Sequence, residues 1–450
     1  MTQTPSLDTL THALLAAARR AGADTADAMA VASTSLSIDT RAGALEQAER
    51  SEGTEIGLRV LVGKRQACVS GSDLREETMD TMAERAVAMA RLAPEDPHCG
   101  LADPAQLAES WDIAALDLAD IGSEPEAAAL QEAALACEAA AAAVPGVDQI
   151  EGTSAGFGRT AIHLAASNGF SGGYTRTGHM LSASAITGTG TAMDRDHCYE
   201  HRIYAADLPS PEDVGTRAGT RAAARSGAKR PPSGRFPVLY DERASTSLIG
   251  HLLSAANGAA IARGSSWLIG KMGEAILPAG LSLIEEPHRA RISGSKPFDA
   301  EGLATRSSAI IENGHLARWV LDLASARKLG LESTRNAARG TSAPPSPSVS
   351  NVTLTPGTAS REDLLRDMGT GLLVTSLIGS TINPNNGDYS RGASGFWVEN
   401  GQIAYPVHEC TIAGNLLDML HRLTPANDAQ DHKSHRIPSL LVEGLTLAGA

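Results

Sequence analysis

A single histidine, His251, is the first candidate for metal chemistry in this sequence. It lies in the stretch ASTSLIGHLLSAANGAAI (244–261), whose apolar spacing predicts a helix with leucines on one face and small polar residues on the other. A zinc-binding peptidase helix places a second histidine and a glutamate one to two turns earlier, where this sequence has Thr246 and Ser247. Zinc needs three or four protein ligands. We therefore expect His251 outside the core, on a face that approaches another backbone or lines a cleft.

Two other stretches concentrate possible ligands. In MDRDHCYEHR (193–202), a strand would point Asp196, Cys198 and Glu200 to one side and the histidines to the other, so no three like ligands converge. A polar strand with charge pairs is expected there. In YPVHECTIAGN (405–415), neighbouring side chains diverge, which argues against a reactive pair between a histidine and a cysteine.

The stretch NNGDYSRGASGFWVENG (385–401) is the candidate for substrate contact. Asp388, Tyr389 and Arg391 stand between glycines, which allow another chain to approach closely. Arg391 offers a planar donor fork for a carboxylate or a carbonyl. The alternative is a β-hairpin in which Arg391 pairs with Asp388, and the sequence does not favour either.

Composition narrows the class of protein. The 450 residues carry a net charge of −14, and the densest basic stretch, AKRPPSGR (228–235), is typical of a linker. We expect no nucleic-acid partner.

The first residues lack a signal-peptide pattern, and no run of about 18 apolar residues suggests a membrane span. The five cysteines are scattered and form no C-x-x-C pair, which fits a reducing compartment. The sequence therefore predicts a soluble cytoplasmic protein.

The elements that would position these residues fall into two domains. Residues 1–228 alternate between helical stretches and Gly-punctuated β-rich runs, which predicts an α+β domain of helices and antiparallel sheet. Residues 236–450 are mostly short strands with Gly, Pro and Asn turns, and small helices lie near 322–329, 360–368 and 413–422. We expect a mostly antiparallel, barrel-like second domain with peripheral helices.

Motifs in family order along the second half resemble the TldD/PmbA family, also described as modulators of DNA gyrase, and particularly its PmbA (TldE) branch. They are GHLLSAANGAAIARGSSWL (250–268), PFDAEG (297–302), SARKLGLEST (325–334), MGTGLLVTSLIG (368–379), GDYSRGASGFWVENGQIAYPV (387–407) and TIAGNLLDM (411–419). The first half is similar more loosely.

The resemblance implies a function. Catalytic members of the family resemble zinc peptidases with His-Glu-x-x-x-His on this helix and a cysteine near the C-terminus. On that pattern the first histidine falls on Thr246, the glutamate on Ser247 and the second histidine on His251, and no cysteine follows Cys410. The resemblance thus implies a chain without metal or catalytic residues. A TldD-type partner would supply zinc, and the pair would cleave unfolded or modified peptides.

Two alternatives stay open at this stage. One is a standalone homodimer that binds peptides or serves as a scaffold. The other is an independent metalloenzyme in which His251 acts with His408 or Cys410.

Overall fold

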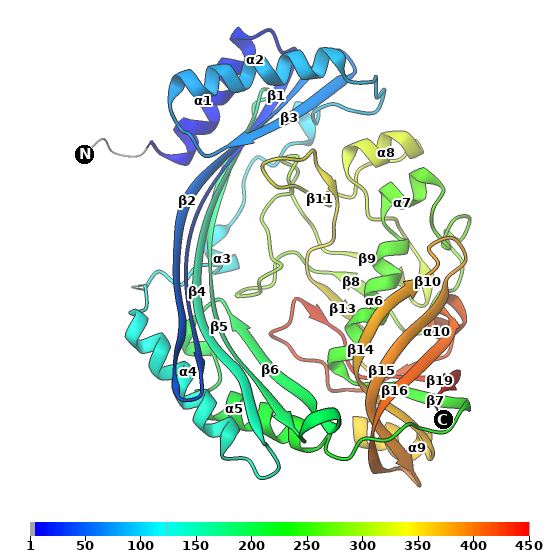
Figure 1. Cartoon of the computed structure of the whole chain (residues 1–450). Coiled ribbons are helices and arrows are strands. Elements are labelled where there is room, and N and C mark those ends of the chain that lie inside the picture. Colours follow the sequence, from blue (N-terminus) through cyan, green and yellow to red (C-terminus); the bar gives the residue numbers. More distant parts are fainter. Residues whose placement is uncertain (1–4, 123, 450) are drawn as a thin grey trace.

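The N-terminal half is built on one long sheet. The computed structural model describes residues 5–122 and 124–449. Six antiparallel strands follow the order β3-β2-β1-β4-β5-β6. Their bounds are β1 (Thr25–Arg41), β2 (Ala44–Val62), β3 (Arg65–Gly71), β4 (Gln149–Ala166), β5 (Ser171–Thr187) and β6 (Asp194–Arg202). Strands of up to 19 residues are long enough to form an arch, and the C-terminal half lies on its concave side (Figure 1).

Helices cover both ends of this arch. The helices are α1 (Leu7–Arg20), α2 (Glu76–Leu92), the short α3 (Ile113–Leu116), α4 (Ala127–Ala142) and α5 (Pro211–Ala223), with 3-10 turns η1 (Pro104–Gln106), η2 (Gly190–Ala192) and η3 (Ala205–Asp207). Leu10 and Leu14 of α1 are fully buried against the sheet. At the other end α4 and α5 pack closely, because a Cβ on Gly215 would lie 2.1 Å from the carbonyl oxygen of Cys137.

The C-terminal half contains a closed five-stranded barrel. Its order is β16-β15-β14-β7-β19, and pairing of β16 with β19 closes the ring. The strands are β7 (Gly234–Tyr240), β14 (Gly371–Ile382), β15 (Asp388–Glu399), β16 (Gln402–Asn415) and β19 (Leu440–Ala448), with β17 (Leu423–Pro425) added to β19. The predicted barrel is confirmed. The barrel is mostly antiparallel, as predicted, and its one parallel pair is β7 with β14, which 130 residues of intervening chain separate.

Smaller elements surround the barrel. A second sheet has the order β10-β9-β8-β13-β18, and β11 pairs with β12. These strands are β8 (Leu283–Glu285), β9 (Ser308–Glu312), β10 (His315–Leu316), β11 (Ala337–Ala338), β12 (Ser346–Pro347), β13 (Val352–Leu354) and β18 (His435–Arg436). The helices are α6 (Glu242–Ala255), α7 (Gly258–Arg263), α8 (Leu323–Leu329), α9 (Arg361–Met368) and α10 (Leu416–His421). The predicted small helices thus appear as α8, α9 and α10.

Buried ion pairs join the two halves. Asp27 of β1 accepts hydrogen bonds from Arg59 of β2, at 2.7 Å, and from Arg339 of the C-terminal half.

The segment predicted as a linker lies along β16, where the Lys229 amide donates to the carbonyl oxygen of Pro406 at 2.9 Å. The division into 1–228 and 236–450 stays a prediction. Within 5–122 and 124–449, no helix has both the length and the apolar character needed to cross a bilayer.

Candidate functional site

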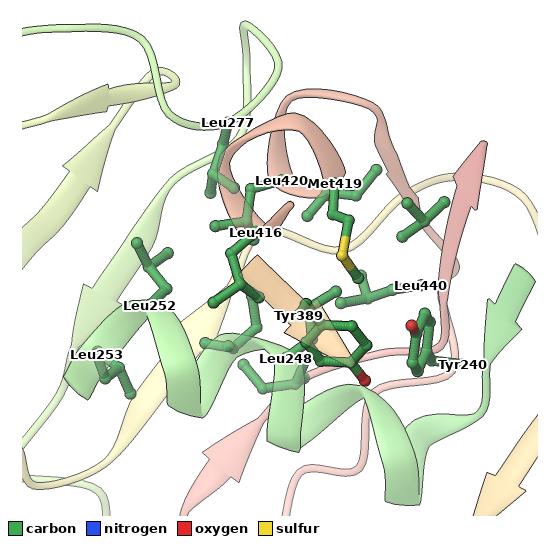
Figure 2. Close-up of a cluster of buried hydrophobic side chains, with 14 of the residues drawn as sticks. Tyr240, Leu248, Leu252, Leu253, Leu277, Tyr389, Leu416, Met419, Leu420 and Leu440 are labelled. Atoms are coloured by element: carbon green, nitrogen blue, oxygen red, sulfur yellow. The ribbon is translucent and has the colours of Figure 1, made fainter. Parts of the chain in front are cut away.

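Helix α6 is anchored by its cap and its apolar face. The Asp241 carboxylate accepts hydrogen bonds from the amides of Arg243 and Ala244, at 3.1 and 3.0 Å, and so caps the helix N-terminus. Leu248, Leu252 and Leu253 of α6 belong to the buried core cluster, and Leu252 lies on the side of α6 that faces α10 (Figure 2). The leucine face predicted from the sequence is therefore buried, and the opposite face remains free for other contacts.

Thr246 and Ser247 are engaged in hydrogen bonds within the protein. The Thr246 hydroxyl donates to the carbonyl oxygen of Glu242 at 3.3 Å. Ser247 Oγ accepts a hydrogen bond from Nη1 of Arg391 at 2.5 Å, and Nε of Arg391 donates to the carbonyl oxygen of Gly379 at 2.7 Å. The polar face of α6 therefore meets a guanidinium where a zinc site would need ligands.

His251 lies half-buried against Tyr389. The two rings meet edge to face with centroids 6.0 Å apart, and the imidazole Nε2 is buried without a hydrogen-bond partner. Burial, and then the charge of Arg391, lowers the pKa of His251 below its ordinary value of 6.5. The ring is therefore neutral at pH 7. The sequence placed His251 outside the core, whereas the structure places it at the core's margin.

Of the two glycines Gly250 and Gly258 in the predicted helix 244–261, only Gly258 meets another backbone as expected. A Cβ on Gly258, at the start of α7, would lie 2.9 Å from the carbonyl oxygen of Val320, so another backbone approaches closely there. A Cβ on Gly250 would meet nothing within 4 Å.

The residues present do not fit a zinc ion. No group of three or more His, Cys, Asp or Glu side chains within 5–122 and 124–449 is arranged to hold a metal. A hydroxyl held by a guanidinium is a poor zinc ligand, and no carboxylate stands at 247 to activate water. The side chains at 246 and 247 therefore do not suit a zinc ion.

The independent metalloenzyme also lacks a reactive thiol. The Cys410 thiol is buried and donates to the carbonyl oxygen of Ala393 at 3.2 Å. Burial raises the pKa of Cys410 to about 11, so the group is a neutral thiol at pH 7. Nothing in this geometry supports a metal site built from His251 with Cys410 or His408.

The three candidates for substrate contact separate in space. Arg391 does not pair with Asp388, so the alternative hairpin pairing is wrong; its donors reach Ser247 and Gly379. Asp388 accepts hydrogen bonds from Asn386 at 2.8 Å and Asn415 at 3.3 Å. Tyr389 is 2% exposed and packs in the core beside α6 (Figure 2). Arg391 lines a cavity.

That cavity has a volume of about 590 Å³ and lies where β6 and α5 face α6 and the segment 430–437. Thr246, Ser247 and Arg391 line it. Sequence reasoning missed the cations that other elements add to its wall, namely Arg217, Arg221, Arg243 and Lys433. The polar stretch 193–202 was the sequence signal for the wall that β6 forms. The sequence alone does not show that this strand faces α6.

Strand β6 confirms the expected alternation. Asp196, Cys198 and Glu200 are buried, and His197 and Tyr199 are exposed. The expected charge pairs form: Asp196 accepts from Arg243 of α6 at 2.8 Å, and Glu200 accepts from Arg217 at 2.8 Å. The first pair joins β6 to α6 of the C-terminal half, and the second joins β6 to α5, so both hold walls of the cavity together.

Comparison with known proteins shows the family to which this chain belongs. The chain matches three PmbA/TldA metallopeptidase domains: domain 1 over 26–90, the central domain over 120–226 and the C-terminal domain over 233–449. It is 35% identical to metalloprotease PmbA of Escherichia coli O157:H7 over 427 residues, which cover 95% of this chain and 92% of that one. The chain belongs to the PmbA/TldD metallopeptidase family, as the sequence motifs implied.

Solved structures agree on the fold. A crystal structure from Bacteroides thetaiotaomicron, named as a candidate modulator of DNA gyrase, superposes with a TM-score of 0.90 at 27% identity and covers 98% of both chains. TldE from Thermococcus kodakarensis superposes with a TM-score of 0.84 over 97% of this chain and 99% of that one. At 21% identity this second likeness concerns the fold alone.

Proposed function

We propose that this chain is the non-zinc subunit of a two-component cytoplasmic metallopeptidase. A TldD-type partner with His-Glu-x-x-x-His on the equivalent helix would supply zinc and the general base. This chain would help to bind unfolded or modified peptides that the pair cleaves.

One observation carries the proposal. Helix α6 keeps its cap and its packing, but Ser247 stands where the family's glutamate would be and is held by Arg391. A carboxylate that activates zinc-bound water must be free to take its proton. The helix therefore retains structure without the means of hydrolysis, as expected of a subunit whose chemistry is supplied by another chain. The five free cysteines are consistent with the reducing cytoplasm.

Reconstitution tests the proposal. The chain is co-expressed with a tagged chain that carries His-Glu-x-x-x-His, and the purified material is assayed with an unfolded peptide. We expect both chains to co-purify and cleavage to require both. A chain that stays a homodimer and leaves the partner's cleavage rate unchanged would instead support the standalone peptide-binding or scaffold protein.

A further inference from the structure

The cavity beside α6 is unusually cationic for this protein. Five of its lining side chains are basic and two are acidic, while the whole chain carries a net charge of −14. The basic side chains are Arg217, Arg221, Arg243, Arg391 and Lys433, and the acidic ones are Glu200 and Glu242. Clefts lined by one sign of charge focus the field and concentrate ligands of the opposite sign.

Carboxylates of the protein neutralise only part of this charge. Arg217 pairs with Glu200, and Arg243 pairs with Asp196 and Asp241. Across residues 5–122 and 124–449, no carboxylate lies within ion-pair distance of the other three cations, which are Arg221, Arg391 and Lys433. Arg221 donates to the carbonyl oxygen of His197 at 3.1 Å, a neutral acceptor.

The nearby side chain of His432 adds no positive charge to the cavity. Burial, and then the charges of Arg202 and Lys433, lowers the pKa of His432 to about 4. His432 is therefore neutral at pH 7 and adds no charge of its own. The surplus of positive charge consequently resides on the guanidinium and ammonium groups that can meet a ligand.

A second hollow adjoins the cavity at Tyr199. It has a volume of about 420 Å³, and Tyr199 of β6, which is 49% exposed, lines both hollows. Gly156 and Gly158 of β4 form part of its wall and present no side chains. The two hollows together offer room for a short extended chain with one end at the cations, which is more than a small ion needs.

From this arrangement we infer that the cavity between β6, α5 and α6 binds a carboxylate of a peptide, with Arg221, Arg391 and Lys433 as its counter-charges. The inference rests on the proposed function for the peptide nature of the ligand. Guanidinium groups bind carboxylates through charge-assisted hydrogen bonds, and Arg391 is already oriented by Ser247 and Gly379. The carboxylate belongs either to an acidic side chain or to the chain end.

Three peptides separate these sources. Their binding to the purified full-length chain without a partner is measured by fluorescence anisotropy. The first is a labelled hexapeptide with three glutamates and an amidated end. The second replaces the glutamates by glutamines, and the third is the glutamine peptide with a free carboxyl end. We expect the first or the third to bind, with affinity that falls as salt is added, and the second to bind at least tenfold more weakly.

A matched pair of lysine variants places the binding in this cavity. Lys433 forms no ion pair with any residue in the described ranges 5–122 and 124–449, so Lys433→Gln should fold normally and weaken binding roughly three- to tenfold, as expected for a half-exposed charge. Lys64→Gln removes an exposed lysine outside the cavity and should leave affinity unchanged. Inorganic phosphate is added as a competitor and should displace the peptide only at much higher concentration.

Several results would overturn the inference. They are equal binding of the amidated glutamine peptide, equal effects of Lys433→Gln and Lys64→Gln, displacement by phosphate at the peptide's own concentration, or no binding of any peptide. The proposed function is judged separately by co-purification and by cleavage with the partner. A working pair without selectivity for carboxylates would therefore refute only this inference.

Discussion

Arg391 of β15 and Ser247 of α6 are joined by a hydrogen bond of 2.5 Å between Nη1 and Oγ, although 144 residues separate them in sequence. On the pattern that the family resemblance implies, Ser247 stands where a zinc motif would have its glutamate. The same guanidinium faces the cavity lined by Thr246 and by the cations of α5 and the segment 430–437. This contact explains why restoring the motif should not restore an enzyme.

The first prediction concerns that restoration. The double variant Thr246→His with Ser247→Glu should bind no zinc tightly and cleave no peptide. The restored carboxylate would lie within reach of Arg391 and form an ion pair, which lowers its basicity, and the ligand set would still be one protein ligand short. Metal content and peptide turnover are measured together. Zinc-dependent turnover above wild type would show that the rest of the site is intact.

A second prediction separates Arg391 from its neighbour Asp388. Arg391→Ala should lower cleavage by the reconstituted pair roughly ten- to hundredfold, because a charge-assisted hydrogen bond contributes about 1.5–3 kcal/mol. Asp388→Ala should leave cleavage unchanged, since Asp388 bonds Asn386 and Asn415 away from the cavity. Melting temperatures accompany both assays. Unchanged cleavage with a large fall in Tm for Arg391→Ala would assign Arg391 a purely structural role.

The third prediction concerns the ion pair between the two halves. Burial alone would raise the pKa of Asp27, but Arg339 and Arg59 outweigh it and hold the pKa below the ordinary 3.8. Asp27→Asn leaves two buried guanidiniums without their counter-charge and should lower the free energy of unfolding by roughly 3–5 kcal/mol. Denaturant titration measures the change. The exposed pair of Arg230 and Glu409 supplies the control, and Glu409→Gln should cause no measurable loss.

The same pair sets a pH dependence. Because the folded pKa of Asp27 lies below its unfolded value, the stabilisation is complete above about pH 4 and is lost as the pH falls through the folded value. Wild type should therefore lose more stability than Asp27→Asn over this acid range. Parallel losses in the two proteins would contradict the assignment.

A fourth prediction concerns the ring of His251. Its pKa is lowered by burial and by Arg391, so Arg391→Gln should raise that pKa, as followed by NMR of the imidazole protons. In the wild type the fold favours the neutral ring, so this stabilisation is present above pH 6.5 and is lost as the pH falls. An unchanged titration in Arg391→Gln would mean that the guanidinium charge does not reach the ring.

Two helical glycines provide a fifth test, of packing. Gly215→Ala should destabilise the protein by roughly 1–3 kcal/mol, because the new Cβ would meet the carbonyl oxygen of Cys137. Gly250→Ala places its Cβ in open space within α6 and should stabilise the protein by about 0.5–1 kcal/mol. The two denaturation midpoints should move in opposite directions. A shift of the same sign in both would refute the close packing of α4 on α5.

Local chemistry explains what the sequence could predict. The leucine face of α6 depends on residues close in sequence, and it is present. The predicted helix 244–261 is divided because Asn257 caps a new helix, α7. Such signals lie within a few residues and need no knowledge of the fold.

Long-range placement explains what the sequence could not predict. The contact of Arg391 with Ser247, the pairing of Arg339 with Asp27 across 312 residues, and the parallel pairing of β7 with β14 arise only from the folded chain. The sequence therefore identified Arg391 as a candidate, but it did not show that Lys433 and Arg221 share its cavity.

The most direct test of the central claim is the zinc content of the isolated chain, measured together with its peptidase activity. Protein purified without chelator and loaded with excess zinc is dialysed, and its metal is counted per chain while cleavage of an unfolded peptide is followed. We predict no stoichiometric zinc and no cleavage until a chain with His-Glu-x-x-x-His is added. One tightly held zinc per chain, with activity that a chelator removes and zinc restores, would contradict the account.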